Sequence, residues 1–303
     1  MRILNTMAAR AIPLVPRSLI RKISRRYIAG ATRSEALVRV RALDAAGYCT
    51  TIDVLGETAS SLEEVESMTG EYLALIDALH TESLRAEVSI KPSALGLLFD
   101  APACKQQVSC IVAAAASRGV SACIDMEDVS CTQKTLDLFA EIETRGTDVG
   151  VALQAYLRRT YDDIVPLAGR GSRLRICKGI YAEADLHLVD GASRDRTAIN
   201  SHFTRHVSDA LEAGSFVGIA THDETLIDAL VAWIGHERIA PNRFEFQMLL
   251  GVCEPLRERL RAYGFQVRVS VPYGHDWYGY STRRIKENPR IAGYILKSLF
   301  SMG

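Results

Sequence analysis

The sequence contains no Cys-x-x-Cys pair, although it has seven cysteines among its 303 residues. Metal sites built from cysteine need ligands at close and regular spacing, so this absence argues against a metal site. The number of cysteines is odd, and several of them stand in apolar segments. We therefore expect buried, reduced thiols in an intracellular protein, and no bound metal.

The sequence also lacks a long apolar run and an excess of charge of either sign. No apolar stretch reaches the ~18 residues that indicate a transmembrane helix. The 36 Lys and Arg residues are balanced by 36 Asp and Glu residues, so no global field attracts nucleic acid or a membrane. The remaining composition, 48% hydrophobic and 24% charged, is that of an ordinary soluble globular protein. Any anion-binding site must therefore be local.

The N-terminal region lacks acidic residues, since none precedes Glu35, whereas Arg and Lys recur. A transit peptide or a membrane-surface segment is one interpretation of this pattern. Pro13 and Pro16 would break a long amphipathic helix there, which favours a solvated basic helix leading into the fold. We expect a basic helical arm over residues 1–45 and a protein that is cytoplasmic or peripheral to the inner membrane (mitochondrial if the source is eukaryotic).

After residue 45, eight short β-rich runs alternate with stretches of helical period. The predicted strands lie at 48–55, 86–91, 120–126, 149–156, 173–180, 215–221, 243–249 and 266–271. The clearest helical stretches are 60–80, with Ser60 or Ser61 as N-cap, a segment around 102–117, and 195–213.

Strict alternation of strand and helix argues for a parallel sheet with helices outside. Eight units in ~250 residues match the size of an α/β protein of the (βα)8 TIM-barrel type, here a single domain over residues 46–303. An open doubly wound sheet is the alternative. The turn after the first strand reads "DVLGETASS", which lacks the G-x-G-x-x-G pattern of dinucleotide-binding folds.

Polar residues collect at the carboxyl ends of the predicted strands, where barrels place their active sites. These residues are Asp53, Glu57, Lys91, Asp125, Gln154, Arg175, Lys178, Tyr181, Thr221, His222 and Gln247. A single Lys or Asp at such a position is usually a solvated or paired loop residue. Together they carry more weight, because polar groups destabilise a strand that is buried on both faces. Cations predominate once the C-terminal arginines are included, which predicts a ligand with negative charge.

The stretch "YSTRRIKENP" places Tyr280, Arg283, Arg284 and Glu287 at helical spacings i, i+3, i+4 and i+7, on one helix face. A solvated face with an Arg283–Glu287 pair is the plain interpretation. Pro289 instead favours a short helix near the barrel rim. There, two guanidinium groups would grip one carboxylate by charge-assisted bonds, and Glu287 would restrain them when the site is empty.

Ordered motifs on successive strands resemble those of the proline dehydrogenase family, from about residue 25 to residue 296. The matching segments are "IDVLGE", "SIKPSALG", "CIDMED", "LQAYLRRT", "RLRICKGIY", "IATHD", "FEFQMLLG" and "VPYGHDWYGYSTRRIKENP". The resemblance implies FAD bound without a Rossmann domain. It implies oxidation of L-proline to 1-pyrroline-5-carboxylate by hydride transfer to flavin N5, with electrons passed on to a membrane quinone.

The resemblance also implies roles for individual residues. It assigns catalytic roles to Lys91, Asp125, Arg175 and Glu287. It assigns the substrate to Lys91, Tyr181, Leu249, Ser270, Tyr280, Arg283 and Arg284. It assigns the cofactor to Gln154, Arg175, Lys178, Gly179, Thr221 and His222. Arg175 beside flavin N5 would stabilise the negative charge of the reduced flavin.

One position departs from the family pattern. The eighth strand, "VRVSVPYG", carries Ser270 where typical proline dehydrogenases carry Tyr, and the branch that oxidises hydroxyproline resembles this sequence in having Ser there. The smaller side chain enlarges the pocket and could admit a ring hydroxyl, so the same chemistry on 4-hydroxyproline or another modified imino acid stays open. A neutral interpretation is that Tyr273 or Tyr278 fills the gap.

Two other functions compete with the flavoenzyme. A barrel lyase or aldolase would use Lys91 or Lys178 as a Schiff-base amine, but neither lysine explains the paired arginines. A degenerate barrel kept as a binding module would explain Ser270, but not the retention of the other charged residues.

Overall fold

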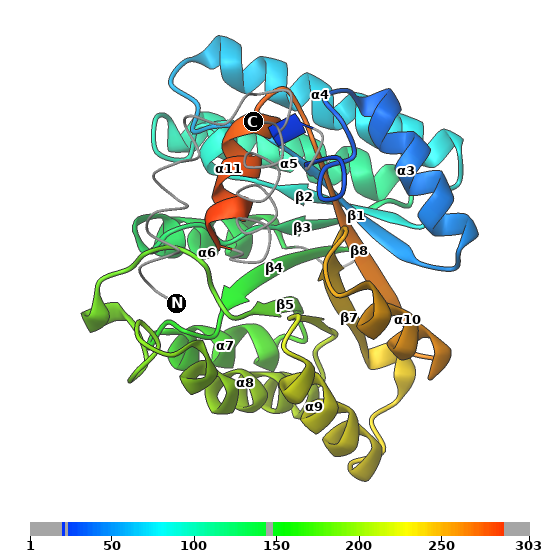
Figure 1. Cartoon of the computed structure of the whole chain (residues 1–303). Helices are drawn as coiled ribbons and strands as arrows, with labels where there is room; N and C mark the ends of the chain where they lie inside the picture. The colour runs from blue at the N-terminus through cyan, green and yellow to red at the C-terminus, as the bar shows by residue number, and fades with distance from the viewer. Residues whose placement is uncertain (1–19, 22–23, 144–147, 288–303) are drawn as a thin grey trace, which may run out of the picture.

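The chain forms a closed barrel of eight parallel strands in sequence order, with β1 paired to both β2 and β8 (Figure 1). The computed structural model describes residues 20–21, 24–143 and 148–287, and side chains up to Thr282. The strands are β1 (Cys49–Val54), β2 (Ala86–Ile90), β3 (Ser121–Ile124), β4 (Val149–Gln154), β5 (Arg173–Cys177), β6 (Val217–Ala220), β7 (Phe244–Leu249) and β8 (Val267–Tyr273). The predicted barrel and all eight predicted strands are confirmed.

Helices surround the barrel on its outer side (Figure 1). They are α3 (Arg33–Ala45), α4 (Leu62–Thr81), α5 (Ala101–Ser117), α6 (Val129–Ile142), α7 (Thr160–Gly169), α8 (Asn200–Glu212), α9 (Glu224–His236) and α10 (Glu254–Ala262), while α11 (Trp277–Glu287) follows β8. Short 3-10 turns are η2 (Ser93–Leu95), η3 (Asp185–His187), η4 (Arg196–Ile199) and η5 (Pro241–Arg243). Ser61 caps α4 as predicted, because its side chain accepts from the Glu64 amide.

The first helix of the described chain packs on the last strand. Helix α3 contacts β8 and β1, the seam where the barrel closes. The segment before it is tied to the end of β8, since the Ala29 amide donates to the Pro272 carbonyl at 2.9 Å and the Gly274 amide donates to the Gly30 carbonyl at 3.1 Å. With this seam covered by α3, the helix that follows β8 reaches the barrel mouth. The domain boundary at residue 45 stays a prediction.

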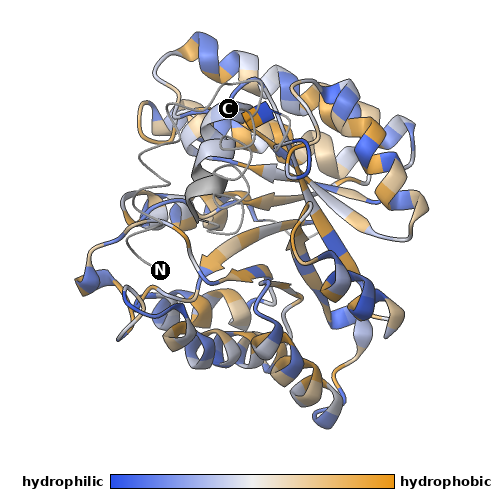
Figure 2. Ribbon diagram, in the orientation of Figure 1, coloured by the Kyte–Doolittle hydropathy of each residue, from blue (hydrophilic) through white to orange (hydrophobic). Residues whose placement is uncertain are grey.

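The two faces of the strands differ in chemistry. On β5, Leu174 and Ile176 point outward and are buried against the helices, whereas Arg173 and Arg175 point into the barrel. Figure 2 shows apolar residues along β3 and β4, and polar residues interrupting β8. The outer layer therefore supplies the apolar core, and the barrel interior is free to hold charges if they are paired.

None of the seven cysteines, all of which lie in the described part of the chain, forms a disulfide. The expectation that they are buried is confirmed for Cys104, Cys123 and Cys131. Cys49 and Cys177 are half-buried, and the expectation is wrong for the other two. Cys110 faces solvent from α5, and Cys253 lies in the exposed turn before α10. Within the described part of the chain, no helix combines the length and apolar character needed to cross a membrane.

The buried ring of His206 leads us to expect that the folded protein loses stability in mild acid. The ring is fully buried on α8 against Tyr161, at 4.4 Å between centroids, and neither ring nitrogen has a hydrogen-bond partner among the described residues. Burial lowers the pKa of His206 to about 4 from 6.5. The unfolded chain therefore binds a proton at His206 below about pH 6.5, whereas the folded protein binds it only below about pH 4.

This uptake should reduce the free energy of unfolding by about 2 kcal/mol between pH 7.5 and pH 5. Urea unfolding at the two pH values measures it, and His206→Leu should remove this part of the pH dependence. His236→Gln, on a largely exposed side chain, controls for the loss of a histidine in general. An identical pH dependence in His206→Leu and wild type would contradict the prediction.

Candidate active site

A cavity of about 1060 Å³ opens at the carboxyl ends of the strands. It is lined by every predicted site residue whose side chain is described, namely Lys91, Asp125, Gln154, Arg175, Lys178, Gly179, Tyr181, Thr221, His222, Leu249, Ser270 and Tyr280. The side chains of Arg283, Arg284 and Glu287 lie outside the described part of the structure. Their backbone continues α11 beyond Tyr280, which does reach the cavity.

Arg175 is held by side chains from β2 and β7 and from the turn after β3. Its Nε donates to Oε1 of Gln247 at 2.7 Å, and its Nη1 donates to Oδ1 of Asp125 at 2.6 Å and to Oγ of Ser89 at 3.1 Å. Its Nη2 forms an ion pair with Glu87. Four of its five N–H donors are thus engaged by described residues, which fixes the guanidinium and leaves one Nη2 donor for a ligand.

Charge pairing holds Arg175 and Glu87 in their ionised forms. Burial alone would lower the pKa of Arg175, but the carboxylates of Glu87 and Asp125 outweigh it and the pKa is raised. Burial would raise the pKa of Glu87, but Arg268, Arg173 and Arg175 together lower it to about 2. Arg175 and Glu87 therefore both remain charged at any physiological pH.

Lys91 follows β2 and forms an ion pair with Asp53 at the end of β1, with Asp125 at 3.7 Å. Burial would lower the pKa of Lys91, yet the two carboxylates raise it overall. A Schiff-base amine must be deprotonated to attack a carbonyl, so this environment disfavours Lys91 as the nucleophile of a lyase. The other lysine considered for that role, Lys178, forms an ion pair with Asp223 at 2.7 Å.

The predicted cofactor residues lie together around the ends of β4, β5 and β6. Gln154 donates to the Glu127 carbonyl at 2.8 Å, and Asp223 accepts from Lys178 at 2.7 Å and from Asn200 at 3.1 Å. Asp223 also caps α9 by accepting from the Leu226 amide. At this corner of the cavity, one carboxylate thus pairs with a lysine and caps the positive end of a helix.

Thr221 and His222 shape the same corner through backbone contacts. The Thr221 hydroxyl accepts from the Asp223 amide at 3.2 Å, which forms a tight turn before α9. The Leu249 amide donates to Nε2 of His222 at 2.8 Å, so the ring bridges the ends of β6 and β7. His222 is thereby oriented by Leu249, one of the residues assigned to the substrate.

Gly179 is required by its surroundings. Its φ is +92°, and a Cβ there would overlap the buried ring of Tyr156. Gly171, in the turn before β5, has a similar φ of +72° but open space around it. The two glycines share the conformational cost of substitution and differ in the steric one.

Gly171→Ala should cost ~1 kcal/mol of stability through the positive φ alone. Gly179→Ala should cost ~1–3 kcal/mol more because the methyl group meets Tyr156. Thermal unfolding of the purified variants measures both effects. Equal losses of stability in the two variants would show that the ring of Tyr156 moves aside to make room for the methyl group.

Ser270 points into the cavity from β8, between Leu249 of β7 and Thr51 of β1 in the strand register. The suggestion that Tyr273 fills the space left by the smaller side chain is wrong. Tyr273 lies on the outward face of β8, where its hydroxyl donates to Glu71 of α4 at 2.5 Å. Tyr278 is likewise not among the cavity-lining residues.

The charges of the described lining nearly balance, and the predicted excess of cations depends on Arg283 and Arg284, whose side chains lie outside the described residues. The lining carries six carboxylates (Asp53, Glu57, Asp125, Glu127, Asp128, Asp223) and five cations (Lys91, Arg175, Lys178, Arg196, Arg268). Four of the cations form ion pairs, and Arg196 donates to the Gly179 carbonyl. The prediction that cations predominate at the complete site therefore stays a prediction.

Four charged residues inside the barrel escaped the sequence reasoning: Glu87, Arg173, Glu245 and Arg268. Arg268 pairs with Glu245, and Glu87 pairs with both Arg173 and Arg175. The signal was present in "AEVSIK", "RFEFQML" and "QVRVSV", where charged residues alternate with apolar ones in strands that should be buried. Such alternation in a barrel marks the inward face.

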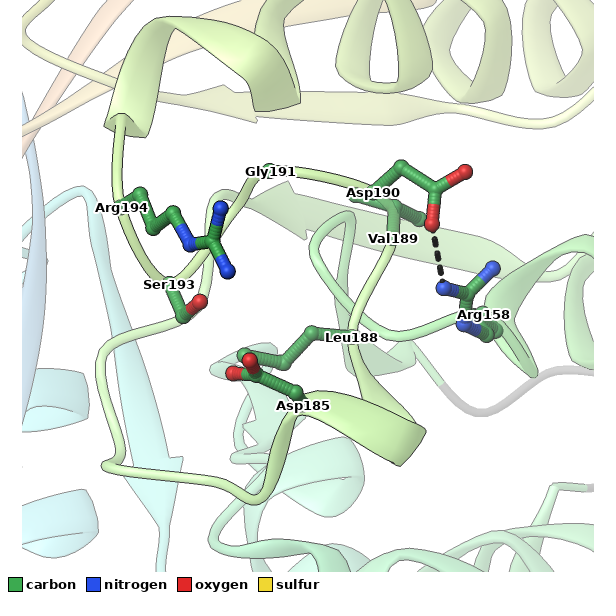
Figure 3. Close-up of a pocket in the computed structure, with 8 residues that line it drawn as sticks. All are labelled: Arg158, Asp185, Leu188, Val189, Asp190, Gly191, Ser193 and Arg194. Carbon is green, nitrogen blue, oxygen red and sulfur yellow. Dashed lines mark hydrogen bonds and ion pairs between the residues drawn. The ribbon is translucent and has the colours of Figure 1, made fainter.

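A second, smaller cavity of about 230 Å³ lies under the loop between β5 and α8 (Figure 3). Arg158 and Asp190 pair across one side of it at 2.6 Å, while Arg194 and Asp185 point toward its centre from the other. None of the predicted site residues lines it. The larger cavity is therefore the candidate active site.

The sequence matches the family model described as proline dehydrogenase over residues 36–295. Proline dehydrogenase 1 of Bacillus subtilis (strain 168) is 33% identical over 276 residues, covering 91% of this chain and 90% of that protein. Proline dehydrogenase of Deinococcus radiodurans is 33% identical over 282 residues, with the same coverage of 91% and 90%. The similarity thus extends over nearly the full length of these relatives.

Solved structures share the fold. Proline utilization A from Bdellovibrio bacteriovorus, inactivated by N-propargylglycine, superposes with a TM-score of 0.79 at 22% identity. The match covers 88% of this chain and 33% of that larger chain. Since the family model spans most of the sequence and relatives reach 33% identity, the chain belongs to the proline dehydrogenase family.

Proposed function

We propose that this protein is an FAD-dependent dehydrogenase that oxidises L-proline to 1-pyrroline-5-carboxylate, the first step of proline catabolism. The observation that carries the proposal is the convergence of the described family-matched side chains on one cavity at the barrel mouth. Active sites of barrels lie at this end of the strands. Family membership and the enzyme names of the relatives point to the same activity.

The residues present fit a large anionic cofactor such as FAD. The cavity, at about 1060 Å³, exceeds the ~300–1000 Å³ typical of pockets for drug-sized ligands, so it has room for more than one five-membered ring. Oδ1 of Asn200, beside Lys178 and Asp223, is buried without a hydrogen-bond partner among the described residues. Lys178, Gly179, Thr221 and His222 would hold the cofactor at this corner, and Gln154 and Arg175 would contact it deeper in the cavity.

When bound, FAD supplies the two-electron oxidant that accepts a hydride from the substrate. The chain's own residues orient the substrate and exclude water. Tyr181, Leu249 and Tyr280 wall in the pyrrolidine ring, and Arg283 and Arg284 hold its carboxylate. Asp125 is fixed by Ser89 at 2.7 Å and by Arg175 at 2.6 Å, and it orders this wall in turn.

Arg175 contributes a positioned positive charge and one hydrogen-bond donor. Its guanidinium is fixed before any ligand arrives, so it needs no reorganisation when negative charge develops nearby. Lys91 pairs with Asp53 and lies 3.7 Å from Asp125. It can therefore shift from one of these carboxylates to the other when the substrate carboxylate enters. These roles follow the family pattern residue by residue and are part of the proposal.

Spectroscopy of the purified protein tests the function directly. We expect a yellow protein whose flavin absorbance bleaches anaerobically on addition of L-proline and recovers with a soluble quinone analogue, the proposed acceptor class. Pipecolate and D-proline serve as related compounds for comparison. A colourless protein that cannot be reconstituted with FAD, or a flavoprotein that proline does not bleach, would rule the proposal out.

Ser270 sets the room available beside the substrate ring, so we extend the proposal to 4-hydroxyproline as a second substrate. Ser270→Tyr should lower kcat/KM for 4-hydroxyproline relative to proline by ~10-fold or more, because the phenol occupies the space of the ring hydroxyl. Ser270→Phe is the matched variant with the same ring and no hydroxyl, and should behave alike if size decides. An unchanged ratio of the two kcat/KM values in both variants would contradict this role.

A further inference from the structure

The guanidinium of Arg175 is held at its Nε edge by a neutral group and at its Nη edge by charged ones. Gln247 Oε1 accepts from Nε at 2.7 Å, while Asp125 and Glu87 bind the Nη nitrogens. The Nη contacts hold only the outer end of the planar guanidinium. The hydrogen bond from Nε holds the inner end as well, and so opposes rotation of the plane about the Cδ–Nε bond.

The amide of Gln247 is itself oriented by a buried charge. Its Nε2 donates to Oε1 of Glu245 at 2.8 Å, and Glu245 is fully buried. A carboxylate accepts and cannot donate, so it selects the nitrogen end of the amide and turns the oxygen toward Arg175. Glu245 is held in turn by Arg268 and by Gln266, at 2.6 Å to the latter.

The path of Gln247 across the barrel depends on a glycine of the neighbouring strand. Gly218 of β6 is paired with Arg175 of β5 and with Glu245 of β7 in the strand register. A Cβ at Gly218 would overlap the amide group of Gln247. The φ of Gly218 is not in the left-handed region, so backbone conformation does not require glycine here. Glycine is required instead because the amide of Gln247 occupies the space that a Cβ would take.

We propose that Gln247 is the positioning residue that fixes the guanidinium plane of Arg175 in the cavity, and that Gly218 is glycine in order to leave it room. This inference rests on the proposed function, in which Arg175 faces the reacting end of the flavin. Gln247 acts through Arg175 and needs no contact with the substrate. Its loss should therefore alter the electrostatics at the cofactor more than the binding of proline.

Gly218→Ala and Gln247→Leu test the inference in the full-length holoenzyme. Each should let the guanidinium turn and so weaken its stabilisation of the reduced cofactor. We expect the equilibrium constant for reduction of the bound flavin to fall at least tenfold, a shift of about 30 mV for a two-electron couple. The KM for proline should change much less than kcat. Phe246→Leu, on the outward face of the same strand, is the control for a buried substitution in β7.

The outcomes separate this inference from the proposed function. Wild-type potentials in both flavin-loaded variants would overturn it, as would a crystal structure of either variant with the Arg175 guanidinium in its original plane. A shift as large in Phe246→Leu would also overturn it, since general loosening would then suffice. A wild-type protein that binds no flavin would defeat the proposed function, while the crystallographic comparison would still decide the role of Gln247.

Discussion

Arg284→Met is expected to raise the KM for proline by about 100- to 1000-fold, the cost of removing the protein's partner of the substrate carboxylate, while the flavin spectrum stays that of wild type. The described cavity wall offers no cation outside an ion pair except Arg196, which donates to a backbone carbonyl. A substrate carboxylate must therefore find its counter-charge elsewhere. Helix α11 carries Tyr280 into the cavity, and position 284 follows one helical turn later.

Steady-state kinetics together with the visible spectrum measure this separation of roles. Arg284→Lys keeps the charge but loses the planar fork, so it should fall between wild type and Arg284→Met. Lys286→Met is the matched control, because its helical register places it away from the Tyr280 face of α11. Loss of flavin together with proline affinity in Arg284→Met would show that the arginine supports the cofactor rather than the substrate.

The barrel could be predicted because its strands and helices carry local signals. Apolar, β-branched runs such as those around Ile52 and Val269 recur at regular spacing, and Ser61 is an N-cap residue that marks the start of α4. The position of α3 could not be predicted. Which helix covers the β8–β1 seam depends on contacts between chain ends more than 200 residues apart, such as that of Ala29 with Pro272, and periodicity does not report them.

The site could be predicted where it depends on strand ends, and not where it depends on the direction of side chains. Counting by two along the predicted strand 173–180 puts Lys178 on the opposite face from Arg175, but β5 ends at Cys177, so the alternation no longer applies to Lys178. Strict alternation along β8 places Arg268 and Ser270 inside and Tyr273 outside, which counting by two would have shown. The pairing of each cation with a carboxylate needs the closed barrel, because the partners come from different strands.

Arg268→Met is expected to lower the free energy of unfolding by ~3–5 kcal/mol, the largest stability effect foreseen for a single substitution here. Arg268 is 6% exposed, and its guanidinium pairs with Glu245, which is fully buried, and donates to the Thr50 carbonyl at 2.8 Å. Its removal leaves a carboxylate inside the barrel, with Arg173 4.0 Å away as the nearest remaining cation. Taking that charge out of water without a partner is what costs the free energy.

Chemical unfolding of Arg268→Met, Glu245→Leu and the double variant Arg268→Met/Glu245→Leu tests whether the cost comes from the unpaired charge or from lost packing. The double variant should recover part of the loss, since an apolar pair of similar volume replaces a buried ion pair at little cost. The recovery should be incomplete, because Gln247 and Gln266 also donate to Glu245 and would lose their acceptor. A double variant as unstable as the sum of the two single variants would show that packing around Arg268, rather than its charge, stabilises the barrel interior.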